Sequence, residues 1–149
     1  MLQNQTPDEW LPAETTTHQD HVIAHVIGAT VLGYFVHDEA LHLLLDIGFI
    51  WTVYLDGQMV LLPRSMAINE LEIASEMRTE LNREVEMLDH DRHEAAVLCH
   101  ITAAPLECLI TEVSFWANDD RRRLLLGGGR ESLVIETSLG TAEIKIIAG

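Results

Sequence analysis

The chain has few of the residues that would place it in a specialised class of protein. It contains 2 cysteines in 149 residues, too few for a disulfide-stabilised secreted domain and compatible with a reducing compartment. Its longest uncharged apolar stretch, residues 22–36, is shorter than the ~20 residues that a membrane-spanning helix requires. The sequence does not open with a basic region followed by an apolar one, as a signal peptide would. We therefore expect a cytoplasmic protein that does not bind membranes.

Basic residues are also scarce, which narrows the choice of partner. The chain has 9 Lys and Arg against 24 Asp and Glu, for a formal net charge of -15. Such a charge repels the phosphates of nucleic acids and anionic lipids, whereas it speeds the encounter with a basic protein. The same charge also serves solubility alone. We expect no nucleic-acid partner, and either a basic protein partner or self-association as a homo-oligomer, of which a homodimer is the simplest.

What the chain does have is enough apolar surface for one core. Apolar residues make up 48% of the sequence, and its length suits a single domain. Residues 1–20 are polar, contain two prolines and show no periodicity. We interpret residues 1–20 as a polar tail or strap and residues 21–149 as a single α+β domain.

Alternating apolar residues predict strands in the first half of the domain. Residues 41–55 carry a large apolar side chain at every odd position, which indicates a strand whose odd face is buried. Its length predicts a bend near Gly48 or a division into two strands. Asp56-Gly57 follows as a hairpin turn. Upstream, residues 21–37 are apolar on both faces and predict a central strand that ends in a turn at Asp38-Glu39.

A change of period then predicts one long helix. From Asn69 to about residue 90, apolar residues recur every three or four positions, and Asn69 with Glu72 has the spacing of a capping box. Further short strands are expected between residue 96 and residue 148. Together these patterns predict an α+β fold: a mainly antiparallel, curved sheet of about seven or eight strands that could close into a barrel-like form, packed on the single amphipathic helix.

The segment "LDHDRHE" contains the first candidate site. If the helix continues, His90 and His93 lie on one face and could share a metal ion with Asp89. The alternative is a solvated helix end, where histidines interact favourably with the helix dipole. A third ligand and the glutamate of a H-E-x-x-H motif are not identifiable.

Three other groups of polar residues stand close together in the sequence. His37 and His42 flank the predicted turn and could face one another in a pocket. Arg121, Arg122, Arg123 and Arg130 lie near three consecutive glycines and could bind an anion, although no phosphate-binding loop motif is present. His18, His21 and His25 fall in a segment predicted as extended, where such spacing cannot chelate one ion.

These observations leave two functional hypotheses. The first is a non-enzymatic binding module that engages a basic protein or a second copy of itself, without a cofactor. The second is a metal-binding or small-ligand-binding protein, or an enzyme, that uses histidines in a pocket between the sheet and the helix. Approach of two or more of these six histidines to within about 5 Å in a concave pocket would favour the second hypothesis: His25, His37, His42, His90, His93 and His100.

Overall fold

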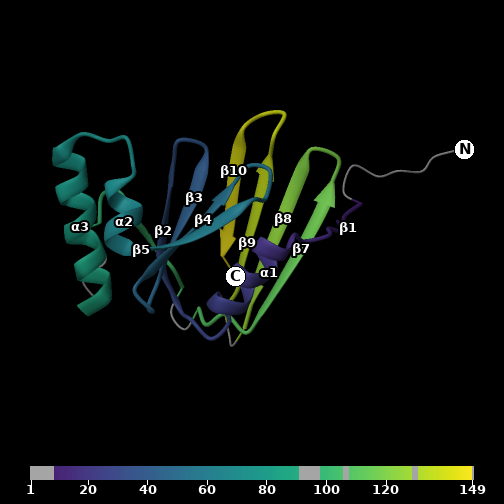
Figure 1. Ribbon diagram of the computed structural model, residues 1–149, viewed down its shortest axis with the longest axis horizontal. Helices are drawn as coiled ribbons and strands as arrows, with labels where there is room; N and C mark the ends of the chain where they lie inside the picture. The colour runs from purple at the N-terminus through teal and green to yellow at the C-terminus, as the bar shows by residue number, and fades with distance from the viewer. Residues whose placement is uncertain (1–8, 91–97, 106–107, 129–130, 149) are drawn as a thin grey trace, which may run out of the picture.

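A computed structural model describes residues 9–90, 98–105, 108–128 and 131–148. In these residues the chain forms three helices and ten strands, and two of the helices form a layer that is followed by two antiparallel sheets (Figure 1). The mixed α+β class predicted from the sequence is confirmed. None of the helices in this part of the chain combines the length and apolar character needed to cross a membrane.

The first sheet lies next to the helical layer and has the order β5-β4-β3-β2-β6. Its strands are β2 (Val31–His37), β3 (Ala40–Leu45), β4 (Phe49–Tyr54), β5 (Met59–Pro63) and β6 (Thr102–Ala103). The predicted turns at Asp38-Glu39 and Asp56-Gly57 connect neighbouring strands, and Gly57 adopts a φ of 89° there. The long alternating segment is divided near Gly48 into β3 and β4, which pair with each other.

The second sheet has the order β1-β7-β8-β9-β10 and is built mainly from the C-terminal third of the chain. Its strands are β1 (Leu11–Pro12), β7 (Glu112–Asn118), β8 (Arg121–Gly127), β9 (Leu133–Ser138) and β10 (Glu143–Ala148). Strand β1 pairs with β7, so part of the predicted polar strap belongs to the sheet.

Two apolar cores hold the layers together. The inner core lies between the two sheets, where Leu41, Leu43 and Trp51 of the first sheet meet Leu124 and Leu133 of the second. The outer core lies on the opposite face of the first sheet and is covered by helices α2 (Arg64–Asn69) and α3 (Ser75–His90), whose buried residues include Ile68, Leu81, Val85 and Leu88. Strand β3 is therefore buried on both faces.

Helix α1 (Thr17–Val26) corrects the first part of the strand predicted over residues 21–37, whose second part is β2. The side chain of Thr16 accepts a hydrogen bond from the backbone N–H of Gln19, and the Gln19 side chain accepts one from the N–H of Thr16. This reciprocal pair is a capping box, which starts a helix. Val22 and Val26 then point into the inner core, because residues four apart share one face of a helix.

The single helix predicted over residues 69–90 and the single curved sheet are also corrected. Helix α2 ends at Asn69 and α3 begins at Ser75, and between them the carbonyl of Leu71 accepts a hydrogen bond from Arg78 instead of from a helical N–H. The strands form two open sheets of five rather than one sheet of seven or eight that closes into a barrel-like form. Strands β7 to β10 are joined by short connections and pair with one another, so they build a sheet of their own.

Candidate functional site

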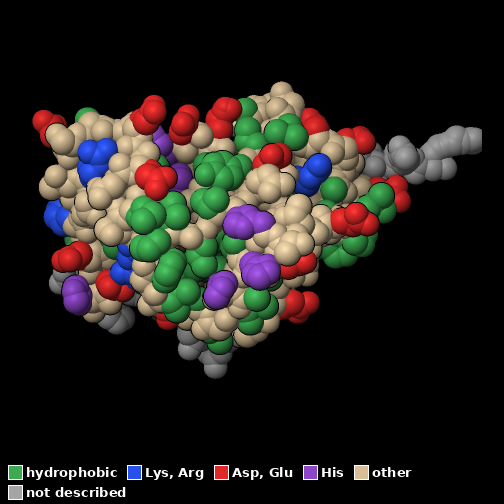
Figure 2. Space-filling view, viewed as in Figure 1, with side chains coloured by type: hydrophobic (Ala, Val, Ile, Leu, Met, Phe, Trp, Pro, Cys, Tyr) green, Lys and Arg blue, Asp and Glu red, His purple; other side chains and the backbone are tan. Residues whose placement is uncertain are grey.

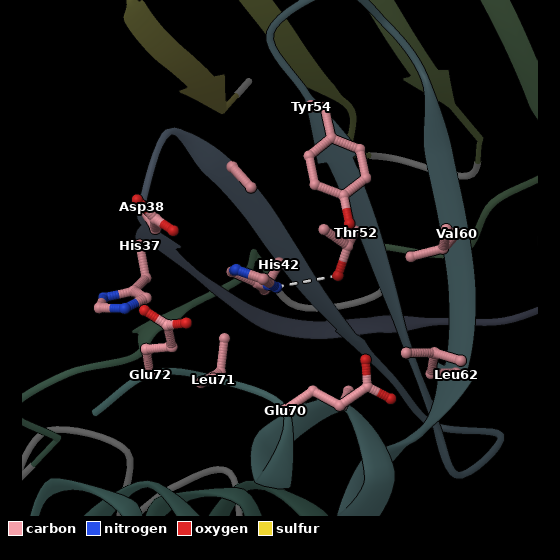
Figure 3. A pocket seen from close by; sticks show the side chains of 12 residues that line it. His37, Asp38, His42, Thr52, Tyr54, Val60, Leu62, Glu70, Leu71 and Glu72 are labelled. Atoms are coloured by element: carbon pink, nitrogen blue, oxygen red, sulfur yellow. Dashed lines mark hydrogen bonds between the residues drawn. The ribbon is translucent and has the colours of Figure 1, made fainter. Parts of the chain in front are cut away.

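A pocket of about 220 Å³ opens on the outer face of the first sheet, beside the connection between α2 and α3 (Figure 3). We call it the acidic pocket. Its lining residues come from β2 to β5, the β2–β3 turn and the segment from α2 to α3: His37, Asp38, Ala40, His42, Thr52, Tyr54, Val60, Leu62, Ala67, Glu70, Leu71 and Glu72.

His42 lies at the base of this pocket and is 7% exposed. Its Nδ1 atom is 2.9 Å from the hydroxyl oxygen of Thr52, and its ring stacks on Phe35 with centroids 4.7 Å apart. The other ring nitrogen, Nε2, is buried and makes no hydrogen bond of normal geometry among the described residues, although the backbone of His37 lies close enough to the ring to favour its protonated form. Figure 3 shows Nε2 directed to the side of the pocket where His37 and Asp38 lie. A buried polar atom without a partner costs free energy unless a ligand or water satisfies it.

The environment of His42 keeps its ring uncharged at neutral pH. Burial, reinforced by the nearby His37, lowers the pKa of His42 from 6.5 to about 4, and the backbone of His37 opposes the shift only in part. A neutral imidazole has one N–H donor and one lone pair. The His42 ring therefore brings hydrogen-bonding capacity to the pocket without positive charge.

The rest of the polar lining is anionic. Asp38, Glu70 and Glu72 are the charged residues other than histidine around the pocket, and no Lys or Arg is among the residues that line it. Asp38 and Glu39 both adopt positive φ angles, 51° and 59°, in the tight turn between β2 and β3. Positive φ at both central residues is the geometry of a two-residue hairpin turn of type I′.

The acidic character continues outside the pocket. Asp38 and Tyr54 also border an open depression over the hairpin ends, which carries Glu39 and Asp56. Carboxylates are numerous along this edge of the molecule (Figure 2). The pocket and the hairpin ends therefore form one negatively charged surface.

The predicted metal candidates at the end of α3 are placed as follows. Asp89 forms an ion pair with Arg64, with an N–O distance of 2.8 Å, and this hydrogen-bonded partner lowers the pKa of Asp89. The Arg64 guanidinium also donates to the carbonyl of Leu45. His90 is the exposed last residue of α3, and His93 lies outside the described residues. Asp89 thus serves to join α3 to α2 and β3.

The predicted anion-binding arginines make contacts within the second sheet. Arg123 pairs with Glu136 at 2.9 Å, and Arg122 donates to the backbone carbonyls of Asp119 and Arg121. Arg121 and Arg123 both lie over the ring of Trp10, at 4.9 and 4.2 Å from its centroid. Arg130 lies outside the described residues. Three of the four arginines therefore hold the N-terminal segment or the strands in place.

The three histidines that the sequence analysis excluded as a metal site, His18, His21 and His25, lie on one surface of the protein. Because residues 17–26 are helical, His18, His21 and His25 lie along one side of α1, next to Ile47 and Phe49, where they border a second depression of about 410 Å³. Figure 2 shows histidine side chains beside hydrophobic ones in the middle of this face. The capping-box spacing of Thr16 and Gln19 was the sequence signal that could have revealed this helix.

Of the six histidines considered for convergence, His37 and His42 line one pocket. His25 lies in the separate depression on α1. Within the described residues, no group of three or more His, Cys, Asp or Glu side chains is arranged to hold a metal ion. Thr52, Glu70 and Glu72 were not singled out from the sequence, since they reach the pocket from segments 10 to 30 positions away from His42.

Comparison with known proteins adds no further information about the site. No family model, curated protein or solved structure matches this chain.

Proposed function

We propose that this protein is a binding module whose acidic pocket receives a cationic side chain, that of a lysine or arginine, from a basic protein partner. The observation that carries this proposal is the Nε2 atom of His42, buried and without a hydrogen bond of normal geometry at the base of a pocket lined by carboxylates. The proposal takes the basic partner from the first hypothesis, which rests on the net charge, and the pocket that contains His37 and His42 from the second.

The chemistry of the lining favours a cation. In the tautomer whose proton lies on Nδ1, the ring donates to the hydroxyl oxygen of Thr52, and Nε2 then offers a lone pair to an N–H of the incoming side chain. Asp38, Glu70 and Glu72 supply negative charge around it, and apolar residues such as Val60 and Leu62 can contact its methylene groups. A carboxylate-bearing guest would meet only repulsion and a ring that carries no charge.

The size and surroundings of the pocket favour a side chain of a protein over a free ligand. Its volume of about 220 Å³ is below the several hundred Å³ typical of small-molecule sites. The open acidic surface over the hairpin ends, with Glu39 and Asp56, extends the area available to a larger basic partner. Such complementarity accelerates association and selects the partner.

The proposal is tested with short capped peptides that contain one lysine or one arginine, titrated into the isotopically labelled protein and followed by NMR. The controls are peptides of the same shape with norleucine or citrulline. We expect shifts at Thr52 and Tyr54 with the cationic peptides and none with the neutral ones.

Two double variants separate pocket binding from general attraction. Glu70→Gln with Glu72→Gln removes two charges from the pocket, whereas Glu76→Gln with Glu86→Gln removes two from exposed positions of α3. The pocket variant should weaken binding about fivefold or more, as expected for the loss of roughly 1 kcal/mol, and the control should change it little. Equal weakening by both variants, or equal binding of the norleucine peptide, would refute the proposal.

A further inference from the structure

The histidine-bearing side of α1 carries a separate inference that does not depend on the acidic pocket. Helix α1 is fixed at its start by the capping box of Thr16 and Gln19. Gln19 also donates to the carbonyl of Gly57, and Val22 and Val26 are buried in the inner core. The exposed imidazoles on this helix therefore project from a rigid, anchored element rather than from a loop.

His21 and His25 have the spacing of a metal-chelating pair. They lie four residues apart within one regular helix, which places their Cβ atoms about 5–6 Å apart on the same face. The same spacing relates the two histidine ligands of the H-E-x-x-H motif, in which both bind one zinc ion. His18 is less suitable as a third ligand, because its Nε2 atom lies 2.9 Å from the carbonyl oxygen of Met59. His25 is in the last turn of α1, where the helix dipole favours a positive charge.

A pair of imidazoles leaves the coordination of a zinc ion incomplete. Zinc in proteins is usually held by four ligands in a tetrahedron. Within the described residues, no group of three or more ligating side chains is arranged around a metal ion, so ligands beyond this pair would come from outside. Beside the two histidines lie Ile47, Phe49 and Leu61, and Ile47 is 45% exposed. An apolar surface next to an incomplete metal site is suited to a contact with another chain.

We propose that a divalent transition metal, zinc by its preference for imidazole, bridges two copies of this chain at α1. Each copy contributes His21 and His25, so a two-fold axis through the ion completes the tetrahedron with four imidazoles. The hydrophobic patch of Ile47, Phe49 and Leu61 on each copy is then covered by the other. The metal also offsets part of the repulsion between two chains that each carry a formal charge of -15.

The test measures metal content and molecular mass of the full chain together. After exposure to Zn²⁺ and removal of the excess, the protein should retain one zinc ion per two chains and should sediment as a dimer. With a chelator the same sample should be a monomer. His21→Ala and His25→Ala should each abolish the dimer and weaken zinc binding by on the order of tenfold or more, since changes even in groups that only support a ligand cost that much.

The control is His18→Ala, which removes the histidine of the same helix that lies against the carbonyl of Met59 and should leave both measurements unchanged. Circular dichroism checks the fold of each variant, and His21→Gln and His25→Gln replace any alanine variant that does not fold. One zinc ion per monomeric chain, a dimer that survives the chelator, or unchanged binding in both helix variants would overturn the proposal.

Discussion

His42 combines a buried ring with a nitrogen that forms no hydrogen bond of normal geometry in the described part of the chain. In the folded protein burial lowers its pKa to about 4, against 6.5 for an ordinary histidine, as in the unfolded chain. Between these values the unfolded chain binds more protons than the folded one, so the free energy of unfolding increases with pH. The contribution of the neutral His42 ring to stability is therefore fully present above about pH 6.5 and is lost as the pH falls towards 4.

We expect the parent protein to lose on the order of 2–3 kcal/mol of stability through His42 between about pH 7 and pH 4. His42→Phe keeps a ring that can stack on Phe35 but cannot take up a proton. Chemical denaturation at several pH values should therefore give a shallower pH dependence for the variant. Asp89 contributes to the pH dependence only below about pH 5, because Arg64 lowers its pKa from 3.8, and this contribution is the same in the parent and the variant. If stability depends on pH equally in the two proteins, burial does not lower the pKa of His42 and the prediction is wrong.

His42 also illustrates what could be predicted about the site from the sequence. The turn at Asp38-Glu39 identified His37 and His42 as neighbours of a possible pocket, because the turn signal is local. The alternating pattern assigned the odd positions of β3 to a buried face, which the structure confirms for Leu41 and Leu43. It could not indicate that α2 and α3 cover the even face as well, since those contacts join segments far apart in the chain.

At the scale of single elements, α1 was wrongly predicted as a strand for a definable reason. Val22, Ile23, Val26 and Ile27 are β-branched, and such residues favour strands when only local preference is considered. The capping box and the burial of one face outweigh that preference. The prediction of α3 held over its buried face, including Leu81 and Val85, but its start was placed too early, at the residue that ends α2.

The buried carboxylate of Glu84 is the main polar connection between α3 and the segment that follows it. Glu84 is 0% exposed, and its oxygens accept hydrogen bonds from the backbone N–H groups of His100 and Ile101, at 3.0 to 3.3 Å. This segment leads directly into β6, at the edge of the first sheet. The carboxylate thus holds the chain against α3 at the point where it returns to the sheet.

Glu84→Ala should lower the free energy of unfolding by about 2–4 kcal/mol, because it leaves two backbone N–H groups without their acceptor. Glu84→Gln should cost less, since its amide oxygen can still accept from both groups. Glu86→Ala, at an exposed position of the same helix, is the matched control and should have a small effect. The measurement is denaturant unfolding, with hydrogen exchange of the His100 and Ile101 amides as a local readout. If Glu84→Ala and Glu86→Ala lower the free energy of unfolding equally, the Glu84 carboxylate does not hold this segment against α3.

At the scale of the whole molecule, the excess of negative charge is largely unpaired. Against 24 acidic residues, the described part of the chain forms ion pairs at Asp89, Glu136 and Glu80, the last with His100. Carboxylates that repel one another destabilise the compact state, and dissolved salt screens this repulsion. The acidic surface that would attract a basic partner therefore lowers the stability of the isolated protein.

We expect the melting temperature of the isolated, metal-free protein to rise by about 2–4 °C when the salt concentration increases from about 20 to about 200 mM, which corresponds to roughly 1 kcal/mol for a chain of this length. NaCl and KCl should act alike, because screening depends on ionic strength. The double variant Glu76→Gln and Glu86→Gln, with two fewer negative charges, should show a smaller rise. A melting temperature that stays constant or falls with salt would mean that self-repulsion is offset within the fold, and the charge could then serve partner binding without loss of stability.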